Sequence, residues 1–73
     1  MSPRSDPMDV FVNGKAARMA EGSTVSDVLE SLGFTDGRIA VELNGDICVR
    51  AQHATTLLHE GDRLEVVSFV GGG

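Results

Sequence analysis

Three consecutive glycines, Gly71–Gly73, stand at the end of the sequence, directly after a largely apolar run over 66–70. Because glycine has no Cβ, such a segment adopts backbone angles closed to other residues and can pass through a narrow channel. Its ordering costs more conformational entropy than that of other residues, so it adds little to the stability of a fold. The reactive group in this segment is the unhindered α-carboxylate of Gly73. A carboxylate must be activated before a nucleophile can attack it. The plain alternative is a frayed chain end.

The other reactive side chains form no site in the sequence. One cysteine, Cys48, cannot form an internal disulfide, and His53 and His59 lack the spacing of zinc ligands. Cys48 alternates with apolar neighbours, which predicts a small core or edge residue. We expect both histidines on the surface. The sequence therefore predicts no catalytic residue and no metal site.

Composition describes one small acidic domain. Seventy-three residues lie near the lower limit for a single core without metals or disulfides, and 41% of them are hydrophobic. A net charge of −5, from 11 acidic and 6 basic residues, argues against nucleic acid as a partner. It favours docking on a basic surface of another protein, and it also serves solubility. No secretory signal and no membrane-spanning run are present, so we expect a cytoplasmic protein with no membrane partner.

We divide the chain into a disordered leader over 1–7, a folded domain over 8–70 and a flexible glycine tail over 71–73. Period-two alternation predicts a first strand over 8–12, with its even-numbered residues on one face. The dipeptide at 13–14 is Asn-Gly, a strong hairpin signal because both central positions of a type I′ turn need positive φ. The returning strand is then expected over 15–19.

A helix of about three turns is predicted after this hairpin. Ser23 or Thr24 can cap its first turn, and Asp27 stands three residues after Thr24, as in a capping box. Gly33 is placed to end the helix in a left-handed conformation. The apolar stripe at helical spacing consists of Val25, Val28, Leu29 and Leu32.

The second half predicts three further strands, over 39–43, 47–50 and 63–69. A second Asn-Gly turn joins the first two, and 51–60 is ambiguous, with room for a single helical turn. Either alternating set of residues in 39–43 could face the core, whereas Leu64 and Val66 share the inner face of the last strand. The order β-β-α-β-β-β predicts an α+β fold with one helix packed across a mixed sheet. It suits a ubiquitin-like β-grasp, in which the last strand lies centrally beside the first.

Several motifs stand at matching places along this order: Val12-Asn13-Gly14, Thr24-Val25, Leu29, Leu32-Gly33, the run Ile39–Ile47, Arg50, Gly61-Asp62-Arg63 and Phe69–Gly73. Together they resemble the ThiS family of sulfur carriers in thiamin thiazole synthesis. The resemblance covers 8–73, and the run Val41–Gly45 is what favours ThiS over its relatives. Val49 stands where many members carry proline, and His53 stands where an aromatic residue is common.

The resemblance implies a protein cosubstrate and not an enzyme. A ThiF-like adenylating enzyme would activate Gly73 with ATP and magnesium, and a sulfur donor such as a cysteine desulfurase would convert it to a thiocarboxylate. A ThiG-like thiazole synthase would then take the sulfur, and the carrier itself would bind no cofactor. Gly71 and Gly72 would thread into partner sites. Candidate docking residues near the tail are Phe69, Val70, Leu57 and Leu58, with Arg50 and Arg63 as weaker candidates.

Three alternatives remain open from the sequence. The chain could be a carrier for another pathway, such as cysteine synthesis. It could be the small subunit of molybdopterin synthase, although that subunit is usually longer before its last strand. It could also be a ubiquitin-like interaction module or protein modifier without sulfur chemistry.

Overall fold

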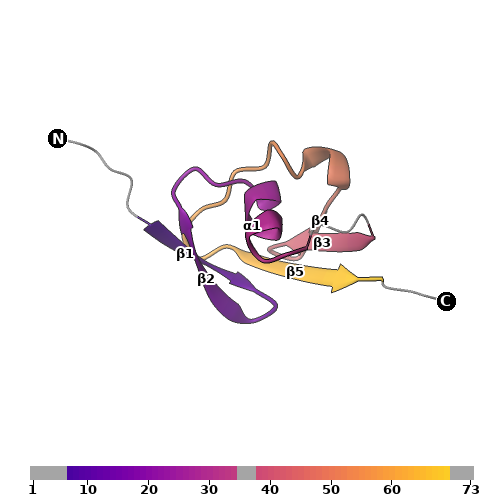
Figure 1. Ribbon diagram of the computed structural model, residues 1–73, viewed down its shortest axis with the longest axis horizontal. Coiled ribbons are helices and arrows are strands. Elements are labelled where there is room, and N and C mark those ends of the chain that lie inside the picture. Colours follow the sequence, from indigo (N-terminus) through magenta and orange to yellow (C-terminus); the bar gives the residue numbers. More distant parts are fainter. Residues whose placement is uncertain (1–6, 35–37, 70–73) are drawn as a thin grey trace.

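A computed structural model describes residues 7–34 and 38–69 of the chain. Its elements follow the predicted order, with a short 3₁₀ turn added before the last strand (Figure 1). They are β1 (Pro7–Val12), β2 (Lys15–Ala20), α1 (Val25–Ser31), β3 (Ile39–Leu43), β4 (Asp46–Cys48), η1 (Arg50–Gln52) and β5 (Arg63–Ser68).

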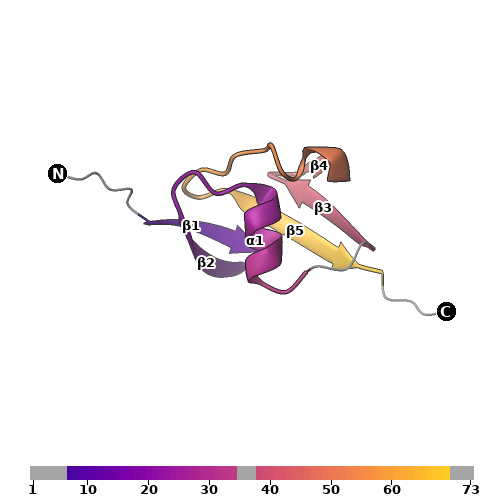
Figure 2. The same cartoon turned by 45° about the horizontal axis from the view of Figure 1, so that its top comes forward.

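The strands form one five-stranded sheet in the order β2-β1-β5-β3-β4. β5 runs parallel to β1 and antiparallel to β3, and both hairpins are antiparallel. The helix α1 packs across one face of this sheet (Figure 2). The predicted β-grasp arrangement is confirmed, with the last strand in the centre of the sheet.

The core lies between α1 and the sheet. Val10, Val41 and Leu64 come from the three central strands and are almost completely buried. The full set of buried apolar residues is Met8, Val10, Val12, Val25, Val28, Leu29, Val41, Cys48, Leu58, Leu64 and Val66. The burial of Cys48 on the edge strand β4 agrees with its predicted role as a packing residue.

Local signals explain how the elements begin and turn. The hydroxyl of Thr24 accepts from the Asp27 N–H at 3.2 Å, and the Asp27 carboxylate accepts from the Thr24 N–H at 2.9 Å, which completes the predicted capping box. Asn13 and Asn44 both have a φ of 53°, and each is followed by a glycine with positive φ. Both Asn-Gly turns are thus confirmed.

Two predictions about the helix are wrong. α1 has 7 residues, about two turns instead of three, and Leu32 is its C-cap. Because the helix ends at Ser31, the last member of the apolar stripe lies beyond the helix and stays 45% exposed. Gly33 follows with a φ of 87°, as predicted.

Two further corrections concern the segment after β3. The strand predicted over 47–50 ends at Cys48, because Arg50 begins η1. His53 is buried, not on the surface, and its Nε2 lies 2.9 Å from the Cys48 carbonyl oxygen. This contact ties the end of η1 back to the edge strand, whereas His59 is exposed as predicted.

Candidate functional site

The candidate site begins where β5 ends. The Phe69 N–H donates to the Arg38 carbonyl at 2.8 Å, and the Phe69 side chain is 56% exposed. Val70 and Gly71–Gly73 lie outside the described residues, so the roles predicted for them stay predictions. What the structure describes is the strand that leads to them and the surface around it.

Asn13 holds the middle of β5 through its side chain as well as its backbone. Its N–H donates to the Leu64 carbonyl at 2.8 Å. Its side-chain amide donates to the Val66 carbonyl at 3.1 Å and accepts from the Val66 N–H at 2.8 Å. The amide of Asn13 thereby acts like one more peptide group of β1, and it extends the parallel β1–β5 pairing past the end of β1 at Val12.

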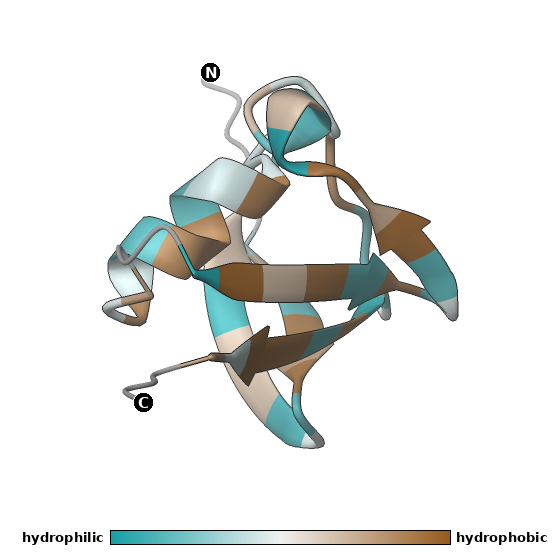
Figure 3. Ribbon diagram, turned by 90° about the vertical axis from the view of Figure 1, so that its right-hand side faces the viewer, coloured by the Kyte–Doolittle hydropathy of each residue, from teal (hydrophilic) through white to brown (hydrophobic). Residues whose placement is uncertain are grey.

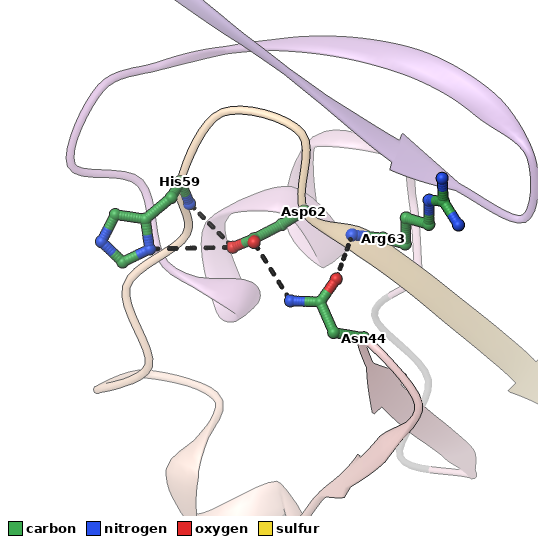
Figure 4. Close-up of polar contacts among 4 residues, drawn as sticks. All are labelled: Asn44, His59, Asp62 and Arg63. Carbon is green, nitrogen blue, oxygen red and sulfur yellow. Dashed lines mark hydrogen bonds and ion pairs between the residues drawn. The ribbon is translucent and has the colours of Figure 1, made fainter.

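Asn44 holds the start of β5 from the other side (Figure 4). Its side chain accepts from the Arg63 N–H at 3.0 Å and donates to the Asp62 carboxylate at 3.1 Å. Asp62 also accepts from the His59 N–H at 2.8 Å. The sequence had assigned both asparagines to turn geometry alone. Their side-chain amides both donate and accept hydrogen bonds, and this was the available sign that they could also hold a neighbouring strand.

Replacing Asn13 with alanine is expected to lower the free energy of unfolding by about 2 kcal/mol, because two partly buried hydrogen bonds to Val66 are lost at about 1 kcal/mol each. The left-handed backbone at position 13 adds to the cost. For a domain of this size the melting temperature should fall by roughly 10 °C. Asn44→Ala is the matched control, because it removes bonds that are exposed. Equal losses in thermal denaturation would contradict a special role for Asn13.

The sheet face turned away from α1 carries no second layer in the described chain (Figure 3). Ile47 on β4 is 75% exposed and Val67 on β5 is 53% exposed. Ala40 lies directly opposite Val67 in the β3–β5 ladder and joins the two. These outward residues were missed as docking candidates. The sequence does contain a sign of them. They are apolar residues at strand positions that alternate with buried ones, as exposed Val67 follows buried Val66.

Two of the proposed docking residues, both in the loop before β5, separate in the structure. Leu58 is 2% exposed and belongs to the core, so it is not available to a partner; its N–H donates to the Ser23 carbonyl at 2.9 Å. Leu57 is 54% exposed and bridges to Thr24, the N-cap of α1. Leu57 is therefore on the helix side of the molecule, apart from the uncovered sheet face.

Within residues 7–34 and 38–69, no three histidine, cysteine or acidic side chains gather in a way that could hold a metal ion. In the same described ranges, no helix is long and apolar enough to cross a membrane. Arg50 and Arg63, the weaker docking candidates, are both exposed but lie on different segments, η1 and β5. The described site is thus a surface next to the end of β5, and not a pocket with reactive groups.

Comparisons with known proteins agree with this fold. The model of the ThiS family matches residues 10–73. A crystal structure of thiamine biosynthesis protein ThiS from Geobacter metallireducens superposes with a TM-score of 0.75 at 35% identity, covering 90% of this chain and 100% of that one. Sulfur carrier protein ThiS from Escherichia coli is 30% identical over 66 residues, which is 90% of this chain and 100% of that protein.

A thiazole synthase from Paramagnetospirillum magneticum is also similar, with 35% identity over 66 residues. The aligned region is 90% of this chain but 20% of that synthase, so the chain spans about a fifth of the length of such relatives. The family match covers most of the chain, and the structural match covers 90% of it. The chain therefore belongs to the ThiS family.

Proposed function

We propose that Gly73 carries sulfur as a C-terminal thiocarboxylate for thiamin thiazole synthesis. A ThiF-like enzyme joins the carboxylate to the AMP part of ATP, with magnesium, and releases pyrophosphate. Sulfide, or the persulfide of a donor such as a cysteine desulfurase, then attacks the carbonyl carbon and displaces AMP. With a persulfide, a second thiol cleaves the resulting acyl disulfide and leaves the thiocarboxylate.

The observation that supports this proposal is the family match, which runs through the three glycines to Gly73. The fold agrees with it, because β5 lies between β1 and β3 in the sheet and its pairing with β3 continues to Ser68, shortly before the glycine segment. A partner that binds the globular surface would thereby hold β5, and the segment that follows it, in a fixed direction relative to its own active site. The chain itself supplies recognition, and the partner enzymes supply the chemistry.

The proposed recipient of the sulfur is a ThiG-like thiazole synthase. Two of the similar proteins are named thiazole synthases, and each contains a stretch resembling this chain over 20% of its length. A carrier-like stretch within such a protein supports a functional association between carrier and synthase. We place the carrier with these enzymes in the cytoplasm.

The test is to incubate the protein with a ThiF-like enzyme, ATP, magnesium and a sulfur donor and to measure its intact mass. The mass should rise by the difference between one sulfur and one oxygen atom. No change with a competent activating enzyme would contradict the sulfur carrier role. Attachment to a lysine of another protein would instead support a modifier.

Pathway assignment needs a second measurement, because other carriers undergo the same chemistry. The protein should co-purify with a thiazole synthase from the same cells. Stable association with the large subunit of molybdopterin synthase instead would overturn the thiazole assignment while leaving the sulfur chemistry intact.

A further inference from the structure

Two carboxylates face each other on the uncovered sheet face. Glu42 on β3 and Glu65 on β5 are directly opposite in the antiparallel ladder, and both are exposed. Like charges in directly opposed positions destabilise a sheet. Among the described residues neither carboxylate has a hydrogen bond or an ion pair that would offset this repulsion. The pair therefore lowers the stability of the fold, and no contact among the described residues compensates for the loss.

The same sheet face shows how such a charge is normally balanced. Asp9 on β1 lies directly opposite Arg18 on β2, and the two side chains form an ion pair at 3.2 Å. Glu65 has Glu42 where Asp9 has an arginine. Arg63 stands two residues before Glu65 on the same strand, but no described cation forms an ion pair with either Glu42 or Glu65.

A shallow hollow of about 280 Å³ adjoins the two carboxylates. We call it the acidic hollow, and it is lined by Ala40, Val41, Glu42, Ile47, Glu65 and Val67. Apart from the two glutamates its lining is apolar, and Ile47 and Val67 are exposed. Lysine and arginine side chains are complementary to such a site. Their apolar stem packs on hydrophobic surface, and their cationic head attracts carboxylates. A guanidinium would suit the paired carboxylates best, since it can donate to both.

We propose that the acidic hollow receives an arginine or lysine side chain from the docking surface of the activating enzyme. The proposal rests on the proposed function, and it names the chemistry of the partner: an apolar surface around one basic anchor. Charge complementarity supports it, because a protein of net charge −5 presents its unbalanced carboxylates there. Val67 is two residues before Phe69, so an anchor in the hollow would fix the enzyme next to the end of β5.

The test compares Glu42→Gln/Glu65→Gln with the wild-type protein in calorimetric binding to a ThiF-like enzyme without ATP. We expect the Kd to rise about ten-fold or more and its salt dependence to weaken. The melting temperature should rise at the same time, because the repulsion is gone. Loss of binding together with a gain in stability is the signature that a structural role would not produce.

Glu21→Gln/Glu30→Gln is the matched control, since it removes the same net charge from a turn and from α1, off the uncovered face. Equal Kd values for the two double variants would overturn the basic anchor. Binding that depends on Glu42 and Glu65, with no sulfur gained in the mass assay, would keep the anchor and overturn the proposed function. Failure of the wild-type protein to bind the enzyme would overturn both.

Discussion

Deleting Gly73 is expected to abolish thiocarboxylate formation while leaving the melting temperature of the domain nearly unchanged. The new terminal carboxylate, on Gly72, would fall short of the adenylation site by about 3.5 Å, the span of one extended residue. The reaction requires the carbonyl carbon and the α-phosphate to be aligned to well within that distance. The stability should not change, because the described core is built from residues before Phe69.

The measurement is intact mass after incubation with the activating enzyme, paired with a thermal melt. Deleting Ser2 is the control, since it shortens the chain equally at the other end and should leave sulfur loading intact. Full loading of the protein lacking Gly73 would show that any terminal glycine suffices. A large fall in melting temperature would assign the glycine to the fold.

Leu64→Ala is expected to cause the largest loss of stability, about 2–5 kcal/mol, the range for truncating a buried leucine. Leu64 is 1% exposed and lies on the central strand, paired with Val12 of β1 and Leu43 of β3. A core this small holds only about 3–5 kcal/mol in total, so much of the variant should be unfolded at 37 °C. Urea denaturation followed by circular dichroism measures the loss.

Val67→Ala provides the contrast on the same strand. Val67 is 53% exposed on the uncovered face, and its truncation should change stability by no more than about 0.5 kcal/mol. It also lines the acidic hollow, so binding to the activating enzyme should weaken although the fold is intact. Similar losses of stability at both positions would mean that the two faces of β5 are not as different as their burial indicates.

Much of the fold could be predicted because its signals are local. Thr24 and Asp27 carry the capping box in their spacing, and each Asn-Gly pair carries its turn in the backbone preference of two residues. Period-two alternation identified the inner faces of β1 and β5 for the same reason. The family resemblance, confirmed by the family match, added the association with sulfur chemistry that these signals do not contain.

The features that could not be predicted depend on register and on where elements stop. The opposition of Glu42 and Glu65 requires knowing which residues of β3 and β5 pair, and the sequence left both faces of β3 open. Leu32 fits the helical period and is exposed only because α1 ends one residue earlier. His53 looked polar and was placed on the surface. The family resemblance implies an aromatic residue at this position, and that was the available sign that His53 is buried.

The central place of β5 has a consequence for how the protein is made. β5 is the last strand in the chain, yet it is the only described strand that connects the β1–β2 hairpin with the β3–β4 hairpin. During synthesis the two hairpins therefore have no common sheet until residues 63–68 have left the ribosome. The pairing of Phe11 with Arg63 is a contact of long sequence separation, which forms slowly compared with the hairpins. A nascent chain therefore has no complete docking face for partner enzymes until β5 has been synthesised and has paired with both hairpins.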